Sequence, residues 1–302
     1  KFESLSDDSL VEGKEELSIH IGVDKDAGTV TITDNGIGMN EQEVMENIGT
    51  IANSGTRKYL ESLDKDKAQD SNLIGQFGVG FYSAFIVSNT VTLISRKAGD
   101  KKSNGTKWIS KGKGEYSIEK IDVENYGTSI TLDIKKSESE FLDDYRIRGI
   151  VSKYSDHITV PILMNKASDE DGVIEYETIN KATAFWTQDK KELSQDDYDE
   201  FYKSLTYDFE GPLTQIHNKL EGKLDYISLL FIPKKAPFDM WEPKRKGGVK
   251  LYAKRVFIME GNEELLPQYL RFIKGVIDTD DLSLNVSREI LQGSKVVDTI
   301  RK

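Results

Sequence analysis

The chain has 302 residues, 37% of them hydrophobic, so it is long and apolar enough to form two domains with separate cores. Its formal net charge of −11 at pH 7 argues against nucleic acids and anionic membranes as partners, because both attract basic surfaces. The lack of cysteine excludes disulfides, and the three histidines have no metal-ligand spacing. Neither a membrane span nor a signal peptide is visible, which predicts a cytoplasmic protein.

The first predicted elements are two strands and a helix. Apolar and polar residues alternate over residues 17–23 and again at Val30 and Ile32, with a turn between the two runs. A helix is predicted to begin at Asn40, whose side chain can cap it. Glu43 lies three residues further on, in the spacing of a capping box.

A long segment over residues 49–75 lacks regular periodicity and contains a charged run. Such a segment inside a compact domain is typical of a functional lid or of disorder. A helix over residues 81–87 is predicted next. It is followed by predicted strands near residues 91–95, 107–110, 116–121 and 128–134.

Residues 135–145 are polar apart from Phe141 and Leu142, and they predict a linker. The first domain would then span residues 1–134 and the second residues 146–302. The second domain is also predicted to be α/β, with Trp186 in its core. Its predicted elements are a helix after Ser194, strands at 226–232 and 250–258, and a helix at 265–274.

Strand parity gives the first indication of a site. Asp34 has the parity of Val30 and Ile32, so its carboxylate faces the core and needs a partner there. Thr128 likewise shares parity with Ile130, so the two polar groups could meet one buried ligand edge. An amine would donate to Asp34, and Thr128 would contact a ring nitrogen. The alternative is that Asp34 only caps the glycine-rich turn after it.

A second glycine-rich motif, GQFGVG at residues 75–80, precedes an apolar helix. Its free backbone N–H groups and the helix dipole suit an anion such as phosphate. The spacing differs from the Rossmann motif, and a Walker lysine is missing, so a purely structural turn is the alternative. Its position after the predicted lid favours phosphate binding.

Four segments resemble the nucleotide boxes of the ninety-kilodalton heat-shock chaperones: DNGIGM at 34–39, GTIA at 49–52, IGQFGVGFYS at 74–83 and GT at 127–128. The resemblance continues through PFDMW at 237–241 and LNVSRE at 284–289, is greater to the bacterial members, and covers nearly the whole chain. It implies a two-layer Bergerat-type (GHKL) ATP-binding sandwich followed by an α/β middle domain. The implied function is a chaperone that couples ATP binding and hydrolysis to the folding and remodelling of client proteins.

The resemblance also implies a site for ATP or ADP. Asp34 would bind the adenine amine, with Gly38, Met39 and Thr128 around the base. Arg288 would contact the γ-phosphate from the second domain and would be catalytic, together with two supporting residues, Asn285 and Gln292. The residues implied near the ribose and phosphates are Asn47, Asn53, Gly78, Val79, Gly80 and Phe81.

The chain departs from the family pattern in two places. In the family, an earlier helix supplies a glutamate that activates water and an asparagine that holds Mg²⁺, and this sequence starts after the corresponding stretch. The resemblance therefore implies that the chain as given does not hydrolyse ATP by the family's mechanism. Asn53 stands where the family usually has a lysine. The family's dimerisation domain would lie beyond Lys302, so a homodimer is expected only of a longer protein.

An apolar cluster next to Pro237 is the implied contact for partly folded client proteins; it consists of Phe238, Met240 and Trp241. Packing of these side chains under their own loop is the alternative. For the whole chain, the alternative function is a client- or cochaperone-binding module that works without nucleotide. Nucleic acid and membrane are not expected as partners.

Overall fold

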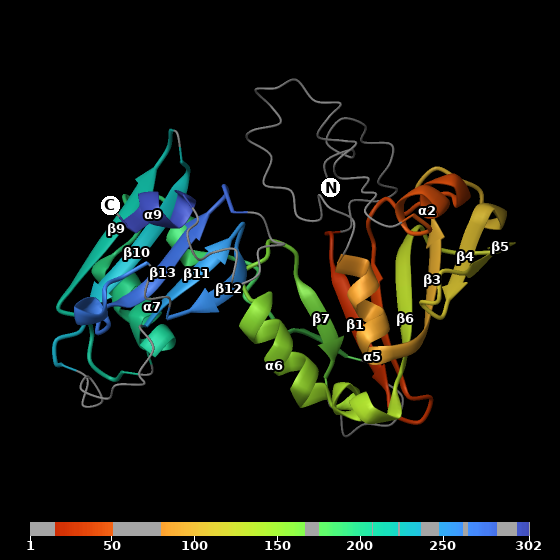
Figure 1. Cartoon of the computed structure of the whole chain (residues 1–302), viewed down its shortest axis with the longest axis horizontal. Helices are drawn as coiled ribbons and strands as arrows, with labels where there is room; N and C mark the ends of the chain where they lie inside the picture. The colour runs from red at the N-terminus through yellow and green to blue at the C-terminus, as the bar shows by residue number, and fades with distance from the viewer. Residues whose placement is uncertain are drawn as a thin grey trace. The chain divides into compact units, whose positions relative to one another are not determined.

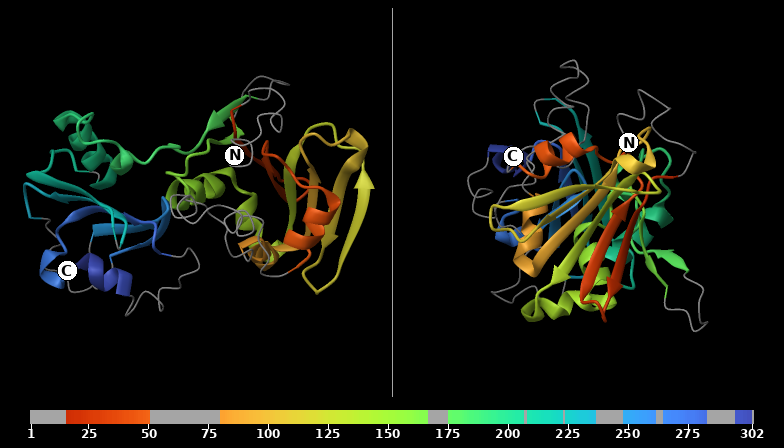
Figure 2. Two further views of the ribbon diagram at one scale, coloured as in Figure 1. Left: turned by 90° about the horizontal axis from the view of Figure 1, so that it is seen from above. Right: turned by 90° about the vertical axis from the view of Figure 1, so that its right-hand side faces the viewer.

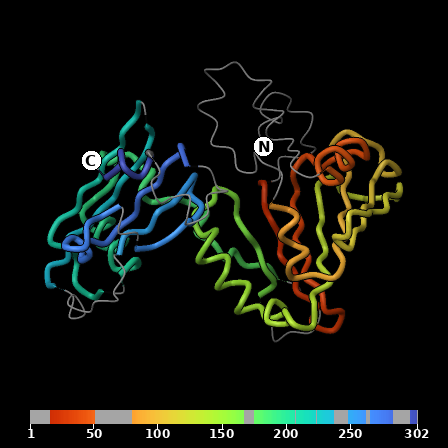
Figure 3. The backbone as a smooth tube through the Cα atoms, viewed as in Figure 1, coloured from red at the N-terminus to blue at the C-terminus, as the bar shows by residue number. Residues whose placement is uncertain are grey.

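The computed structural model describes residues 16–50, 80–166, 175–206, 208–222, 224–236, 248–261, 265–282 and 295–301. They belong to two compact units, Lys1–Ala182 and Thr183–Lys302, and each unit has its own sheet and core (Figure 1). The backbone of each unit can be followed in Figure 3.

The first unit is built on an eight-stranded sheet with the order β5-β4-β3-β6-β2-β1-β7-β8 (Figure 2). Neighbouring strands are antiparallel except β1 and β7, which are parallel. The strands are β1 Ile19–Asp24, β2 Thr29–Asp34, β3 Ser88–Arg96, β4 Gly105–Ser110, β5 Tyr116–Ile121, β6 Gly127–Ile134, β7 Ile162–Asn165 and β8 Tyr176–Thr178.

Helices cover one face of this sheet (Figures 1 and 2). They are α2 Glu41–Asn47, α5 Ala84–Val87, which continues the 3-10 turn η2 Gly80–Ser83, and α6 Asp144–Tyr154. Val44 of α2 packs in a core with Leu93 and Trp108, whereas α6 packs against β7. Ile21 and Val23 of β1 contact both cores, so all three helices lie on the same side.

The opposite face of the central strands is lined with hydroxyl groups. The Thr31 and Thr131 oxygens lie 3.0 Å apart, and those of Thr33 and Ser129 lie 2.9 Å apart. One face is thus apolar and covered by helices, and the other is polar. The predicted two-layer sandwich is confirmed.

The first compact unit ends later than the sequence predicts. Residues 135–145, predicted as a linker, include the 3-10 segment η4 Lys136–Leu142, and Phe141 and Leu142 of this segment pack against the core. Strand β7 then joins the sheet beside β1, so the unit extends to Ala182 rather than to residue 134. A polar segment with only two apolar residues gives no sign that the chain packs on the core and later adds a strand to the same sheet.

The second unit has a five-stranded sheet with the order β12-β11-β13-β10-β9. Helix α7, Gln195–Thr206, packs Tyr198 and Tyr202 on one face, and Val297 of α9, Lys295–Arg301, packs in a separate core. The strands are β9 Thr214–Leu220, β10 Tyr226–Ile232, β11 Gly248–Ala253, β12 Val256–Glu260 and β13 Lys274–Thr279. Trp186, in the 3-10 turn η5 Phe185–Thr187, is buried, as predicted.

Two predictions in this unit are wrong. The single strand predicted over residues 250–258 is a hairpin of β11 and β12, whose turn has Lys254 and Arg255 at φ values of 51° and 67°. Left-handed turns usually contain glycine or asparagine, so this pair gave no turn signal. The helix predicted over residues 265–274 is only a 3-10 turn, η6 Gln268–Leu270, which begins after Pro267.

Candidate functional site

The site begins with a carboxylate on the covered face of the first sheet. Asp34 ends β2 and lies opposite Thr128 of β6, so the two polar residues that parity directs toward the core are cross-strand partners. Burial raises the pKa of the Asp34 carboxyl above its ordinary value, and hydrogen bonds from the backbone N–H groups of Gly36 and Thr128 oppose this rise. Such a desolvated carboxylate is stabilised by a ligand that donates hydrogen bonds.

The turn-capping role of Asp34 is also present. The Gly36 N–H donates a hydrogen bond of 2.9 Å to Asp34 Oδ1. An ionised carboxylate has two oxygens and about four acceptor positions, so this bond leaves capacity for a ligand. Capping and ligand binding are therefore compatible.

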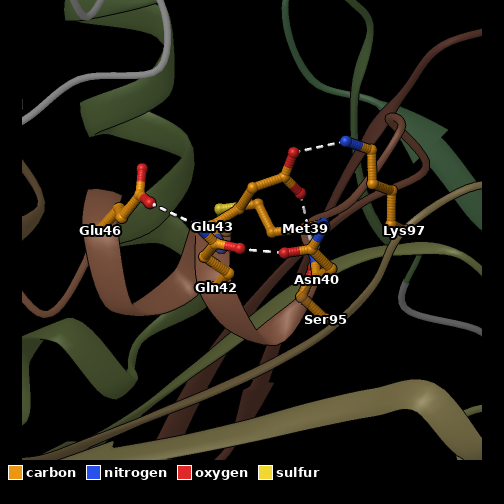
Figure 4. A network of polar contacts seen from close by, with 7 residues as sticks. All are labelled: Met39, Asn40, Gln42, Glu43, Glu46, Ser95 and Lys97. Atoms are coloured by element: carbon orange, nitrogen blue, oxygen red, sulfur yellow. Dashed lines mark hydrogen bonds and ion pairs between the residues drawn. The ribbon is translucent and has the colours of Figure 1, made fainter.

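The loop after Asp34 is pressed against the end of β3. Gly38 has a φ of +65°, and a Cβ atom at this position would lie 1.9 Å from the backbone oxygen of Arg96. The next residue, Met39, donates its N–H to Ser95 Oγ at 2.8 Å (Figure 4). Only glycine fits at position 38, and its close approach brings the loop beside Asp34 and Thr128.

Sequence reasoning missed Ser95, which links the loop at Met39 to Gly127 and Thr128 of β6. Its side chain is fully buried at the end of β3, opposite Thr128 in the register. Ser95 Oγ donates to the Gly127 carbonyl oxygen at 2.8 Å and lies 3.0 Å from Thr128 Oγ1. Its parity with Val91 and Leu93 was the available signal, because that parity points a hydroxyl into the core.

An apolar surface lies beside these polar groups. Ile32 shares the face of Val30 and Asp34, yet 37% of it is exposed, whereas Val30 is only 4% exposed. Its partner in β6 is Ile130, which is half-buried at the edge of the core. A flat heteroaromatic ring could lie on this surface with its polar edge toward Asp34 and Thr128.

Helix α2 leads from the loop toward a second group of predicted residues. It starts with the predicted capping box, in which Asn40 Oδ1 accepts from the Glu43 N–H and Glu43 Oε2 accepts from the Asn40 N–H, each at 2.9 Å. Glu43 also pairs with Lys97 (Figure 4). This capping fixes the helix start beside Met39.

The last residue of α2, Asn47, carries an oxygen that finds no hydrogen-bond donor among the described residues. Its Oδ1 is buried, and no hydrogen bond to it is found within the described part of the chain. A buried acceptor without a donor costs free energy, so this atom fits a site that a polar ligand group or water completes. Tyr82 donates its hydroxyl to the Ile48 carbonyl at 2.7 Å and holds η2, with Gly80 and Phe81, against this end of α2.

Met39, Ile48 and Phe81 all pack on one core, so the residues predicted around the base and part of the predicted phosphate side border the same cluster. As ligand-binding residues they stay predictions. The remaining predicted residues lie outside the described part: Asn53, Gly78, Val79, Asn285, Arg288, Gln292, Phe238, Met240 and Trp241. So does most of the predicted lid over residues 49–75.

The described residues also bear on two other kinds of site. No group of three or more histidine, cysteine, aspartate or glutamate side chains there is arranged to hold a metal ion. No helix in that part of the chain is long and apolar enough to cross a membrane.

The segment that forms most of the first sheet and the candidate site matches a defined class of ATPase in sequence. A family model described as "Histidine kinase-, DNA gyrase B-, and HSP90-like ATPase" matches residues 12–140. A second model, described as "Hsp90 protein", matches residues 165–302. The chain belongs to the heat-shock protein 90 family.

Similar proteins support this assignment along the whole chain. "Chaperone protein HtpG" of Ruthia magnifica subsp. Calyptogena magnifica is 74% identical over 302 residues, which are 100% of this chain and 49% of the relative. The proteins of the same name from Hydrogenovibrio crunogenus and Shigella dysenteriae serotype 1 are 58% and 54% identical, with the same coverage. The chain spans about half the length of these relatives.

Proposed function

We propose that the first compact unit binds ATP and ADP, and that the whole protein is a chaperone that couples ATP binding and hydrolysis to the remodelling of partly folded clients. The observation that carries the nucleotide proposal is the desolvated carboxylate of Asp34, paired across strands with Thr128 beside the exposed Ile32. The family assignment and the names of the relatives support the chaperone function.

In this proposal, Asp34 accepts a hydrogen bond from the 6-amino group of adenine. The tight loop at Gly38 and Met39 borders the base, and the buried Asn47 oxygen accepts a hydrogen bond from the ribose or from water around the phosphates. The phosphates lie along the segment that leads to Gly80 and Phe81, which includes Asn53, Gly78 and Val79. Mg²⁺ would be bound mainly by the phosphates, as is common for this ion.

Hydrolysis and client binding are proposed for the whole protein. Arg288 would stabilise charge on the γ-phosphate, with Asn285 and Gln292 supporting its loop. Phe238, Met240 and Trp241 would contact clients, and the longer protein would act as a homodimer. The names of the relatives support the chaperone function, whereas these residue roles and the homodimer rest on the resemblance.

Titration calorimetry of the chain with ADP and ATP tests the nucleotide proposal. We expect saturable binding that Asp34→Asn weakens at least about tenfold, since the amide cannot accept as a charged group does. Asp133→Asn is the matched control, because it removes the same charge from an exposed position on the neighbouring strand β6. No binding by the unaltered chain, or equal affinity for Asp34→Asn, would contradict the proposal and favour a nucleotide-independent module.

A further inference from the structure

The three polar contacts of Ser95 use its whole hydrogen-bonding capacity. Ser95 Oγ lies 2.8 Å from the Met39 nitrogen, 2.8 Å from the Gly127 carbonyl oxygen and 3.0 Å from Thr128 Oγ1. A hydroxyl has one hydrogen to donate and two lone pairs that accept. Because the serine is fully buried and makes three contacts, which atom donates and which accepts is fixed in each of them.

The direction of each bond follows from the partners. The Gly127 carbonyl can only accept, so it takes the single Ser95 proton, and the Met39 N–H can only donate. The contact with Thr128 then needs its proton from Thr128. The Thr128 hydroxyl hydrogen is directed at Ser95, which leaves its oxygen lone pairs to face a ligand.

When Asp34, the cross-strand neighbour of Thr128, is ionised, it too can only accept hydrogen bonds. The two polar groups at this edge thus present acceptors alone. An exocyclic amino group has two N–H donors and suits such an edge, whereas a ring nitrogen without hydrogen does not. This polarity departs from the sequence-based expectation that Thr128 contacts a ring nitrogen.

We propose that Ser95 is a positioning residue that sets specificity: it fixes Thr128 as an acceptor, so that Thr128 and Asp34 together select purine nucleotides with a 6-amino group. Ser95 is fully buried and acts through Thr128 and Met39 rather than by touching the base. The inference rests on the proposed nucleotide site.

The test compares two ligands that differ only at carbon 6. ADP carries the amino group, and purine riboside 5′-diphosphate carries hydrogen there. Calorimetry gives the dissociation constant of each for the unaltered chain and for Ser95→Ala. In Ser95→Ala, Thr128 is free to turn its proton toward the ring nitrogen, so we expect the preference for ADP to fall roughly fivefold, about the effect of one hydrogen bond.

Two further variants make the result specific. Thr106→Val removes a fully buried hydroxyl that is next to Ser95 in the register and has no hydrogen-bond partner in the described residues, so the preference should be unchanged. Thr128→Val should lower the preference by itself, and adding Ser95→Ala to it should have no further effect. If Ser95→Ala does not fold, an unchanged preference in Thr128→Val overturns the inference.

The outcomes separate this inference from the proposed function. If the unaltered chain does not bind ADP, the nucleotide proposal fails and the inference fails with it. If the unaltered chain prefers ADP and Ser95→Ala weakens both ligands equally, Ser95 has only a structural role. That result overturns the inference and leaves the nucleotide site standing.

Discussion

At the scale of single residues, the buried carboxylate of Asp34 lowers the stability of the fold and is also the group proposed to bind adenine. Its buried carboxylate is hydrogen-bonded by the backbone N–H groups of Gly36 and Thr128, and its pKa is raised because these bonds do not fully compensate for its burial. Parity predicted the direction of this side chain, because alternation is set by the backbone alone. Parity also directs the Ser95 hydroxyl into the core, but it does not identify the partners of that hydroxyl, because pairing register and packing decide what a buried oxygen contacts.

The pKa of Asp34 makes a prediction about pH. Because the folded-state pKa is raised, the ionised carboxylate opposes folding at neutral pH, and this cost disappears as the pH falls through the folded pKa. ADP needs the ionised form, so we expect stabilisation by ADP to shrink over the same range. Thermal unfolding with and without ADP, from neutral pH to about pH 4, measures both effects. Stabilisation by ADP that stays constant on acidification through this range would contradict the role of Asp34.

Gly38 gives a second prediction at this scale. Gly38→Ala should destabilise the chain by several kcal/mol, because it adds a collision with the Arg96 carbonyl to the cost of about 1–2 kcal/mol for a left-handed alanine. Gly28→Ala is the control, since Gly28 has a φ of +69° and open space around its Cβ position. Denaturant unfolding compares the two variants, and equal losses would show that the loop does not lie against β3 as described.

At the scale of elements, local sequence signals predicted where a helix starts better than they predicted where elements end or how strands pair. The capping box at Asn40 located α2 because both of its hydrogen bonds are local. Strand β7 returns to the sheet through a long crossover, and the Lys254–Arg255 turn lacks the usual residues, so neither had a local signal. Pro267 was a signal against the helix predicted at 265–274, because proline interrupts a helix interior.

The capping box supplies the prediction for this scale. Asn40→Ala should lower the free energy of unfolding by about 1 kcal/mol, because it removes the acceptor for the Glu43 N–H at the start of α2. Gln42→Ala is the control on the same turn; it removes only an exposed hydrogen bond to Glu46, worth about 0.2–0.5 kcal/mol. Chemical denaturation measures both losses. A larger loss for Gln42→Ala would contradict the capping geometry.

At the scale of the whole molecule, the chain consists of two compact units with different sheets, and the described part of the candidate site lies in the first. Alternation and the capping box predicted strands and a helix in the first unit, and the resemblance implied their two-layer arrangement. The resemblance, and not strand parity, supplied the phosphate and catalytic residues. Physical reasoning from the residues alone gave Arg288 no ligand role, because a single arginine after a serine is as typical of a surface or salt-bridged position.

Hydrogen exchange of the whole chain with and without ADP tests the central claim most directly. If adenine binds where we propose, ADP should slow exchange of the backbone amides of Gly36, Met39 and Thr128, and Asp34→Asn should abolish this protection. The amides of β10 in the second unit are the internal reference and should be unaffected. ADP binding without protection at residues 34–39 and 127–128 would contradict the account.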